Sequence, residues 1–326
     1  MCVDALDKND VEKPKNDGRL RVAVAGLGLI GEGAALRLVA ERERYDFCGA
    51  LVRDTGRERA AALKDATVTD EIDALLSLRP DIVIDALPSG DVGRTLIGAA
   101  LQSGVGVVTA NKQAIAGSMA PLTMLAGDRN AYFAYGASVG GGAPMIETVR
   151  SARREGDVGA ISAILNGTVN YILTALQLGD AFDDAVAKAQ QAGFAEPDPT
   201  ADLSGEDARA KLAILSFEAL GAEAPESAIT VEALTRDKAQ EIVETGGVWR
   251  QMSTLQIGED GALRGSVALS QIDASSTFAH VIEEENALQI SLRDGRRFEC
   301  KGKGAGRAPT VGSLFDDLAT AAARRP

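Results

Sequence analysis

The chain has 326 residues, enough for two domains, since single hydrophobic cores stop growing near ~250–300 residues. Its hydrophobic content of 45% and charged content of 25% are those of an ordinary globular protein. The net charge of −13 argues against nucleic acid or an anionic membrane as the main partner, because both would be repelled. A small anionic cofactor is still compatible, because it needs only a locally favourable pocket.

Cysteine usage and the N-terminus both indicate a reducing compartment. The three cysteines, Cys2, Cys48 and Cys300, are widely spaced and form neither a CxxC motif nor a Cys/His cluster. A disulfide framework or a zinc site is therefore not expected, and we place the protein in the cytoplasm. Residues 1–18 lack the apolar segment of a signal peptide, so we interpret them as a disordered leader. No stretch approaches the ~18–20 apolar residues of a membrane span.

The first 135 residues alternate short apolar runs with helical stretches. Predicted strands cover residues 21–25, 46–52, 81–86, 104–109 and 131–135. Ala- and Leu-rich helical stretches lie between them. Near-continuous apolar strands joined by helices are typical of a parallel sheet covered on both faces. We therefore predict an α/β fold with a doubly wound, Rossmann-type domain.

The sequence GLGLIG follows the first predicted strand, with its glycines at Gly26, Gly28 and Gly31. Gly26 allows a tight turn, Gly28 lets the backbone approach a pyrophosphate, and Gly31 lets the helix pack closely on the strand. Leu29 and Ile30 begin that helix, whose free N–H groups and dipole favour phosphates. Glycine-rich turns are common, but in this position the motif predicts a dinucleotide site.

The end of the second predicted strand bears on the choice between NAD and NADP. An acidic residue there accepts a hydrogen bond from the ribose, whereas an arginine pairs with the 2′-phosphate of NADP. Arg53 comes first and Asp54 follows, with Arg57 and Arg59 close behind. This order favours NADP. Asp54 keeps NAD open, and a solvated turn without contact to the cofactor is the alternative.

A lysine follows the fourth predicted strand, in the sequence TANK that ends at Lys112. Open α/β sheets bind ligands beyond the carboxyl ends of their strands, so Lys112 is expected near the nicotinamide. A lysine there could donate a hydrogen bond or a proton to an alkoxide. The alternative is a plain helix entry capped by Asn111.

After Gly136 the pattern changes to that of a second, α+β domain. A Gly-rich loop at residues 138–144 precedes predicted helices at residues 145–154, 171–178, 182–192 and 205–220. Strands are predicted between residues 248 and 298, and a last helix at residues 311–323. His280 is the only histidine and lies in an alternating stretch that we predict as a strand. Its setting favours a packing or surface role and argues against a Ser-His-Asp hydrolase.

Residues 196–211 concentrate charge, with five carboxylates within twelve positions ahead of a predicted helix. Asp207 and Lys211 are four residues apart and share one face of that helix. The alternative is a surface pair worth ~0.3–0.5 kcal/mol, beside a near capping box at Ser204. The residues alone narrowly favour this surface interpretation.

Six motifs in succession make the chain resemble homoserine dehydrogenase. They are GLGLIG, TANK, ASVGGGAPMI (137–146), LNGTVNYIL (165–173), AGFAEPDPTADLSGEDARAKLAI (192–214) and GKGAGRAPT (302–310). The series covers nearly the whole length from residue 19. The resemblance implies a dinucleotide-binding domain of residues 19–136 plus 303–326 and a substrate-binding and dimerisation domain of residues 137–302. It also implies the short form, without a C-terminal regulatory domain.

The activity that this resemblance implies is the reversible oxidation of L-homoserine to L-aspartate-4-semialdehyde, on the route to threonine and methionine. Lys211 would be the acid/base lysine, oriented by Asp207. Glu196 and Asp202 would bind the ammonium and hydroxyl groups of the amino-acid substrate, and Lys112 would lie between substrate and nicotinamide. Two lysines in one cleft are expected to lower each other's pKa toward neutrality.

The resemblance also implies a homodimer or homotetramer and a monovalent cation, Na⁺ or K⁺, on backbone carbonyls of the Gly-rich loop. The carbonyls would be those of Val139, Gly141 and Ala143. The family commonly has a glutamate just before this loop, whereas this chain has Gly136. The loop after the third strand, with Ser89 as an expected cofactor contact, is less polar than in the family.

Two other functions stay open. One is a related dehydrogenase of another small amino or hydroxy acid. The other is a non-catalytic nucleotide-sensing protein on the same fold, which the presence of all five candidate active-site residues disfavours. A thiol-dependent aldehyde dehydrogenase is not supported, because Cys2 and Cys300 lie outside every motif and Cys48 falls in the second strand.

Overall fold

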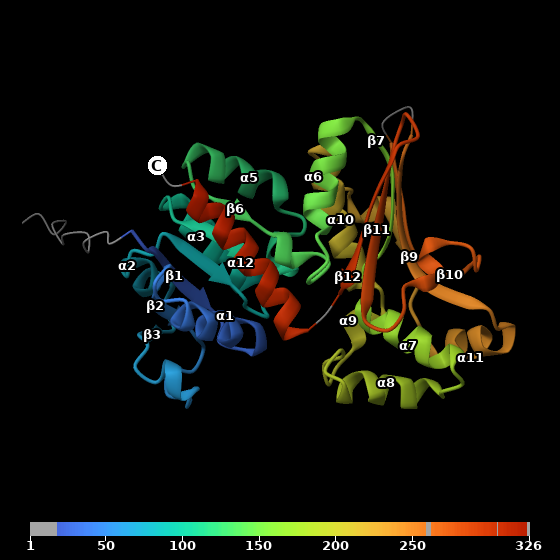
Figure 1. Cartoon of the computed structure of the whole chain (residues 1–326), viewed down its shortest axis with the longest axis horizontal. Helices are drawn as coiled ribbons and strands as arrows, with labels where there is room; N and C mark the ends of the chain where they lie inside the picture. Colours follow the sequence, from blue (N-terminus) through green and yellow to red (C-terminus); the bar gives the residue numbers. More distant parts are fainter. Residues whose placement is uncertain (1–17, 259–261, 305, 325–326) are drawn as a thin grey trace, which may run out of the picture.

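The computed structural model describes residues 18–258, 262–304 and 306–324 (Figure 1). The leader predicted for residues 1–18 lies outside these ranges except for Gly18. Two six-stranded sheets, each with its own helices, form two lobes that lie side by side. No helix within the described ranges is long and apolar enough to cross a membrane.

The first sheet is parallel throughout, in the order β3-β2-β1-β4-β5-β6. Its strands are β1 (Leu20–Ala25), β2 (Tyr45–Leu51), β3 (Val68–Thr69), β4 (Ile82–Asp85), β5 (Gly106–Thr109) and β6 (Phe133–Ala134). The central strands are almost wholly buried, as their apolar composition predicts. The strand order reverses between β1 and β4, and sheets of this kind bind ligands beyond the carboxyl ends of the strands at that point. The predicted Rossmann-type fold is confirmed.

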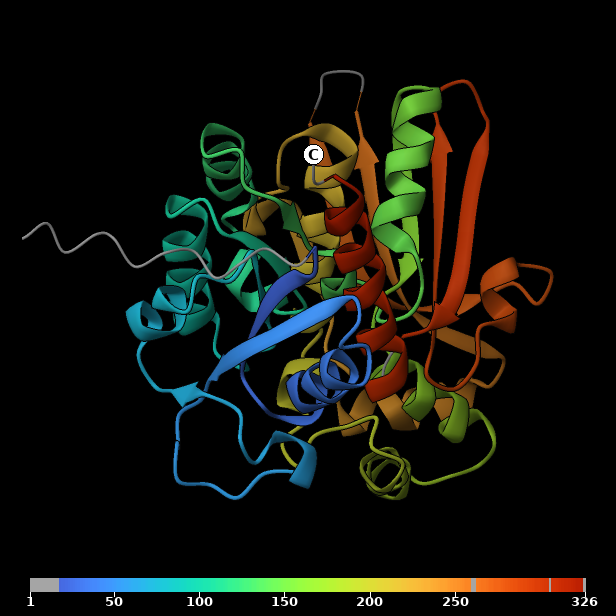
Figure 2. The same ribbon diagram turned by 60° about the vertical axis from the view of Figure 1, so that its left-hand side comes forward.

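Helices cover both faces of this sheet. Val22 and Val24 of β1 share a core with α1 (Leu29–Ala40) and with α12 (Arg307–Ala323), which comes from the far end of the chain and lies beside α1 (Figure 2). Ala23 and Ala25 of β1 point to the opposite face of the sheet, where they share a core with α3 and α5. The remaining helices of this lobe are α2 (Ile72–Ser77), α3 (Gly90–Gln102), α4 (Lys112–Ile115) and α5 (Met119–Asp128).

The second sheet has the order β12-β11-β7-β9-β10-β8, and its pairs are antiparallel except for β10 with β8. Its strands are β7 (Val158–Ile164), β8 (Ile229–Val231), β9 (Val248–Ile257), β10 (Leu263–Ile272), β11 (Glu285–Leu292) and β12 (Arg297–Lys303). The helices of this lobe are α6 (Met145–Glu155), α7 (Gly167–Gln177), α8 (Phe182–Gln191), α9 (Thr200–Leu203), α10 (Glu206–Leu220) and α11 (Arg236–Thr245). In Figure 1, α6 and α10 lie on the face of the sheet that is turned toward the first lobe.

Several differences from the predicted elements have physical reasons. The strands β3, β7 and β8 were not predicted, because β3 and β8 have only two and three residues and β7 is built mainly of Gly, Ala and Ser. His280 ends a short 3-10 turn, Thr277–His280, rather than lying in a strand. The Ser276 side chain caps this turn, and Phe278 and Ala279 are buried, so the apolar alternation there reflects a turn packed on the sheet.

Candidate active site

Glycines shape the turn between β1 and α1. Gly26 has a φ of +84°, and a Cβ on Gly31 would lie 1.7 Å from the Gly26 carbonyl oxygen, so only glycine allows this approach. A Cβ on Gly28 would meet no atom within 4 Å, so this side of the turn is open. Leu29 and Ile30 begin α1, and no side chain caps the helix at Gly28. The turn therefore fits the pyrophosphate of a dinucleotide, which the positive end of the helix dipole would attract.

The residues that bear on cofactor choice lie in an exposed loop after β2. Asp54 Oδ1 accepts a hydrogen bond from the Gly56 N–H at 3.0 Å, in an Asx turn. Arg59 donates to three backbone carbonyl oxygens of the same loop, including that of Asp54 at 2.7 Å. Arg53 is exposed and forms no ion pair with any residue that the structure describes. Its guanidinium is therefore available to an anionic ligand.

Ser89 and Lys112 follow the neighbouring strands β4 and β5, beyond the carboxyl ends of these strands. Ser89 Oγ caps α3 by accepting from the Val92 N–H at 3.4 Å. Asn111 Oδ1 caps α4 by accepting from the Ala114 N–H at 3.2 Å, and its Nδ2 donates to the Ser89 carbonyl oxygen at 3.0 Å. The predicted cap at Asn111 is thus confirmed, and it fixes the helix start from which Lys112 extends.

Asp85 supports this loop and was not identified from the sequence. Its side chain is buried, with Oδ1 accepting from the Leu87 N–H at 3.1 Å and Oδ2 from Thr109 Oγ1 at 3.0 Å. Thr109 Oγ1 also accepts from the Asn111 N–H at 2.9 Å. Burial raises the pKa of Asp85 to about 6, although these hydrogen bonds lower it. The signal in the sequence was a carboxylate at the end of an apolar strand, which needs buried partners.

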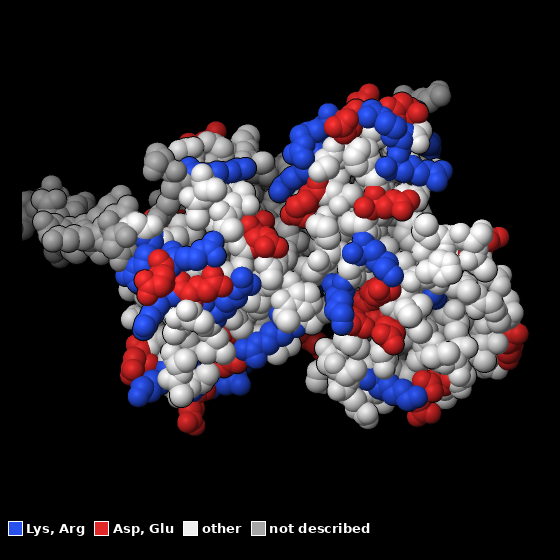
Figure 3. Space-filling model, in the orientation of Figure 1, with Lys and Arg blue, Asp and Glu red and all other residues white. Residues whose placement is uncertain are grey.

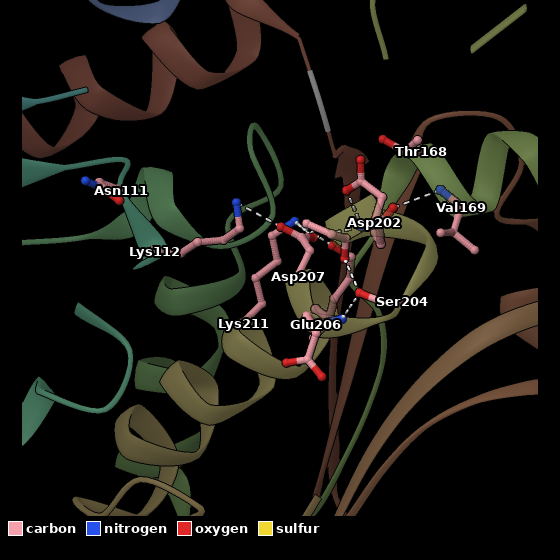
Figure 4. Close-up of polar contacts among 12 residues, drawn as sticks. Asn111, Lys112, Thr168, Val169, Asp202, Ser204, Glu206, Asp207 and Lys211 are labelled. Carbon is pink, nitrogen blue, oxygen red and sulfur yellow. Dashed lines mark hydrogen bonds and ion pairs between the residues drawn. The ribbon is translucent and has the colours of Figure 1, made fainter. Parts of the chain in front are cut away.

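The first turn of α10 places Asp207 between two lysines (Figure 4). Asp207 Oδ1 lies 2.8 Å from Lys112 Nζ, and Asp207 Oδ2 lies 2.7 Å from Lys211 Nζ. Lys211 lies one turn further along the same helix, whereas Lys112 comes from the other lobe. The side chains of Asp207 and Lys211 are only 7% and 12% exposed, so the interpretation of this pair as a surface pair is wrong.

Asn166 joins the carboxylates of the site, although the sequence indicated it only as part of a turn. Its Nδ2 donates to Asp202 Oδ1 and to Asp207 Oδ2, both at 2.8 Å. Its Oδ1 accepts from a backbone N–H in the first turn of α7 and so caps that helix. The carbonyl oxygen of Leu165, just before it, accepts from Lys211 Nζ at 2.9 Å. The residues just before α7 therefore fix the carboxylates of Asp202 and Asp207 and the ammonium group of Lys211 through hydrogen bonds.

These groups line a cavity of about 810 Å³ to which both lobes contribute. Glu196 and Asp202, the predicted substrate ligands, line it together with Lys112, Asp207 and Lys211. Glu196 is exposed in the loop after α8, and Asp202 lies in the short helix α9. The structure thus brings all five predicted residues into one cavity.

In this cavity, the pKa of one lysine is shifted in the direction opposite to the prediction. Burial raises the pKa of Asp207, but the charges of Lys211 and Lys112 outweigh it and hold that pKa well below its ordinary value. Asp207 in turn raises the pKa of Lys112, although burial lowers it. The expected mutual lowering of the two lysines is therefore wrong for Lys112, because a carboxylate lies between them. Burial, followed by the charge of Asp207, raises the pKa of Asp202.

The arrangement can move a proton at an oxygen atom and hold a cationic group beside it. The ammonium groups of Lys112 and Lys211 are donors for an alkoxide or a carbonyl oxygen. Glu196 and Asp202 form an acidic wall that favours a positively charged part of a ligand. An amino acid with a side-chain hydroxyl or aldehyde group carries both features.

The loop expected to hold a monovalent cation is buried at Val139, Gly141 and Ala143. It packs against the second glycine cluster, where the Gly142 N–H donates to the Lys303 carbonyl oxygen at 2.9 Å. The Ala143 carbonyl oxygen already accepts a hydrogen bond from the Met145 N–H at 2.8 Å, and the three carbonyls stay predicted ligands.

Two carboxylates lie beside Gly136, the position at which the resemblance led us to expect a glutamate. A Cβ on Gly136 would lie 3.0 Å from Glu147 Oε1 and 3.1 Å from Asp317 Oδ2. Oxygen donors that suit a hard cation are therefore present next to the loop. Among the described residues, no three or more His, Cys, Asp or Glu side chains gather into a metal-binding group.

Among the described residues, the two cysteines and the histidine that thiol or histidine mechanisms would need lie away from the cavity. Cys48 lies in β2, and burial raises its pKa to about 11. Burial also raises the pKa of Cys300 in β12. Neither cysteine lines the cavity, and His280 does not line it either.

Comparison with known proteins agrees with this geometry. A family model described as homoserine dehydrogenase matches residues 144–319, and one described as its NAD binding domain matches residues 26–135. A homoserine dehydrogenase of Mycobacterium leprae is 33% identical, with 93% of this chain and 72% of the relative covered. An NAD(+)-dependent homoserine dehydrogenase of Pseudomonas canavaninivorans is 30% identical, with 82% and 72% covered.

A solved structure is similar over the same length. The crystal structure of a homoserine dehydrogenase from Thiobacillus denitrificans has a TM-score of 0.82 and 27% identity, with 94% of this chain and 76% of that chain covered. Both lobes and the cavity to which they contribute fall within these matches. The chain therefore belongs to the homoserine dehydrogenase family, the NAD(P)-dependent oxidoreductases that act on a CH–OH group.

Proposed function

We propose that the chain catalyses the reversible oxidation of L-homoserine to L-aspartate-4-semialdehyde with NAD or NADP. The observation that carries this proposal is the placement of Asp207 between Lys112 and Lys211, in a cavity beyond the carboxyl ends of the parallel strands. The names of the similar proteins support the choice of substrate. Bound NAD(P) supplies the hydride acceptor, or the donor in the reverse direction.

Lys211 is the acid/base group in this mechanism. Negative charge develops on the substrate oxygen during reduction of the aldehyde, and the Lys211 ammonium donates a proton to it. In the oxidative direction the neutral amine takes the hydroxyl proton. Asp207 and the Leu165 carbonyl oxygen fix Nζ through contacts of 2.7 and 2.9 Å. Lys112, which Asp207 keeps protonated, adds a second donor that stabilises the alkoxide.

Glu196 and Asp202 orient the substrate. Their carboxylates receive its ammonium group, and Asn166 holds Asp202 in place through a hydrogen bond of 2.8 Å. With the amino end fixed there, the hydroxyl group is directed toward the two lysines across the cavity. The reacting carbon is then presented to the nicotinamide side, where Lys112 enters from the other lobe.

The variant Lys211→Ala tests this assignment. We expect kcat to fall by ~10²–10⁴-fold, because general acid/base catalysis is lost. Lys188→Ala is the matched control, because Lys188 is a lysine in α8 that pairs with Asp180 outside the cavity, and it should keep normal activity. Normal turnover of homoserine by Lys211→Ala would show that another group moves the proton.

We infer that NADP is the preferred cofactor. Arg53 is available to a 2′-phosphate, whereas Asp54 is engaged in its turn. The name of one relative specifies NAD(+), so the ratio of kcat/KM for NADP and NAD decides the question. A ratio above one that falls below one in Arg53→Ala supports the inference, and an unchanged ratio contradicts it.

Several finer properties stay predictions. They are a monovalent cation on the Gly-rich loop, a homodimer or homotetramer, the two domain boundaries, and a cytoplasmic role in threonine and methionine biosynthesis. Initial rates with and without sodium or potassium test the cation, and light scattering tests the assembly. A panel of amino and hydroxy acids separates homoserine from the alternative substrates of a related dehydrogenase.

A further inference from the structure

A second cavity, of about 380 Å³, lies where the two lobes meet on another side of α10. Residues of α5, β6, α6 and α10 line it, together with Arg324, which follows the end of α12. None of its lining residues belongs to the active-site cavity. Its volume lies within the range of ~300–1,000 Å³ that is usual for small-molecule sites.

The charge of this cavity is positive. Three arginines, Arg150, Arg153 and Arg324, line it with a single carboxylate, Glu218. Glu218 is already saturated, because Arg150 donates to both its oxygens at 3.1 Å and the Tyr135 hydroxyl donates to Oε2 at 2.5 Å. Arg150 is therefore neutralised, and the charges of the other two arginines are not.

Arg153 and Arg324 are exposed and lack a carboxylate partner among the residues that the structure describes. Arg153 donates one hydrogen bond, to the Glu218 carbonyl oxygen at 3.0 Å. The Arg324 guanidinium lies 5.2 Å from the centre of the Tyr132 ring. Figure 3 shows Lys and Arg side chains next to Asp and Glu side chains over α6, and the whole chain carries a net charge of −13. Two guanidinium groups without counterions in an acidic protein attract an anion.

Aromatic rings form the rest of the wall. Tyr132 and Phe133 from the first lobe and Phe217 from α10 are all half-buried and line the cavity. Their exposed faces offer apolar contact to a ring or an aliphatic chain. An occupant that uses the whole cavity therefore has both an anionic group and an apolar body.

We propose that this cavity binds a small organic anion, with a carboxylate or phosphate group on Arg153 and Arg324 and an apolar body against Tyr132, Phe133 and Phe217. This goes beyond the proposed reaction and does not depend on it. Phe217 lies on α10, whose first turns carry Asp207 and Lys211, and Tyr132 belongs to the other lobe. A bound anion would therefore bridge the lobes and stabilise one arrangement of them, as an effector does.

Calorimetric titration of the intact protein tests the proposal with four probes. Phenyl phosphate and benzoate carry both features, inorganic phosphate lacks the apolar body, and benzyl alcohol lacks the charge. We expect saturable binding of phenyl phosphate or benzoate, with phosphate weaker and benzyl alcohol not bound. The comparison of phenyl phosphate with benzoate distinguishes a phosphate from a carboxylate site.

Variants then locate the binding. Arg153→Gln combined with Arg324→Gln should weaken it by about tenfold or more, because two charged hydrogen-bond donors are lost. Arg154→Gln is the matched control, since Arg154 is the neighbouring exposed arginine, bonds to Ser151 and does not line the cavity. Absence of saturable binding, equal binding of benzyl alcohol, or full affinity in the double variant would overturn the proposal. The last outcome would place the anion elsewhere, such as in the glycine turn.

Discussion

The buried carboxylate of Asp207 lies between the ammonium groups of Lys112 and Lys211. Charges are expensive to bury unless each has a partner, and removing one partner leaves the others uncompensated. Asp207 has three partners here, Lys112, Lys211 and Asn166, all within 2.8 Å. The carboxylate therefore acts through the lysines, because it sets where their Nζ atoms lie and keeps Lys112 protonated.

We predict that Asp207→Asn lowers kcat by ~10²-fold or more, because the lysines lose the group that positions them. The folded pKa of Asp207 lies below its unfolded value, so the stability it contributes is present above pH ~4 and is lost as the pH falls through the folded pKa. The difference in Tm between wild type and variant should therefore narrow below pH ~4. A difference that stays constant on acidification would contradict this.

For Asp85 we predict the opposite dependence of folding stability on pH. Burial raises its folded pKa to about 6, so its ionisation reduces stability as the pH rises from ~4 through that value. Asp85→Asn should lack this loss, and its kcat should fall about tenfold because the support of Thr109 and the Lys112 loop is weakened. Thermal unfolding across pH and steady-state kinetics measure both. Asp91→Asn, an exposed change in α3, is the control and should match wild type.

The residues that line the cavity could be placed from their motifs, whereas Asp85 and Asn166, which support them, could not. Lys112 and Lys211 follow from their motifs, and the family resemblance assigned their roles. Asp85 and Asn166 act through partners that are distant in the sequence, at Thr109 and Asp202. Residue type alone does not show such pairing. The direction of the Lys112 pKa shift failed for the same reason, because it depends on the position of Asp207.

At the scale of elements, the two glycines Gly28 and Gly31 in and after the turn before α1 serve different purposes. Gly31 is needed for packing, because its Cβ would lie 1.7 Å from a backbone oxygen. Gly28 faces open space and is not needed for packing. Both belong to one motif; the packing role predicted for Gly31 is confirmed, and the role of Gly28 beside a pyrophosphate stays a prediction.

We predict that Gly31→Ala destabilises the protein by about 3 kcal/mol or more, because backbone must move to admit the methyl group. Gly28→Ala should cost less than ~1 kcal/mol, as expected for alanine at an N-cap. Gly28→Ala should instead raise the KM for the dinucleotide, since its methyl group occupies the approach to the pyrophosphate. Urea unfolding and cofactor titration separate the two effects. Equal destabilisation by both changes would be inconsistent with this division of roles.

Most elements were predictable, because their apolar period is set by burial on one or both faces. Prediction failed for β7, whose small residues give no strand signal until β9 and β11 pair with it on either side. It also failed at His280, where a packed turn imitates the alternation of a strand. Pairing between strands that are distant in the sequence, and the geometry of local turns, cannot be predicted from a single sequence.

At the scale of the whole molecule, one side chain ties the lobes together beside the active site. Glu223, in the loop after α10, accepts from the Gly117 N–H at 2.7 Å and from the Met119 N–H at 3.0 Å. These donors lie at the start of α5 in the other lobe, and both Glu223 and Gly117 line the active-site cavity. The carboxylate also suits the positive end of the helix dipole.

We predict that Glu223→Ala raises the KM for homoserine several-fold, because one wall of the cavity loses its attachment to the other. Hydrogen exchange at the start of α5 should increase in the same variant. Glu244→Ala is the matched control, since Glu244 is an exposed glutamate of the same lobe, bonds to Gln240 and does not line the cavity. Unchanged exchange and KM in Glu223→Ala would mean that the lobes are held by other contacts.

The return of α12 to the first lobe governs how the chain can fold as it is made. Phe315 and Leu318 complete the core that begins with Val22 and Val24, yet almost the whole chain separates them. At translation rates of ~5–20 residues per second, the roughly 180 residues between β6 and Phe315 take about 9–36 s, during which one face of the first sheet lacks α12. The second sheet, contiguous in sequence, can close meanwhile. A nascent chain stopped before α12 would therefore leave the apolar core between β1 and α1 partly uncovered and open to chaperones, with the later lobe already folded.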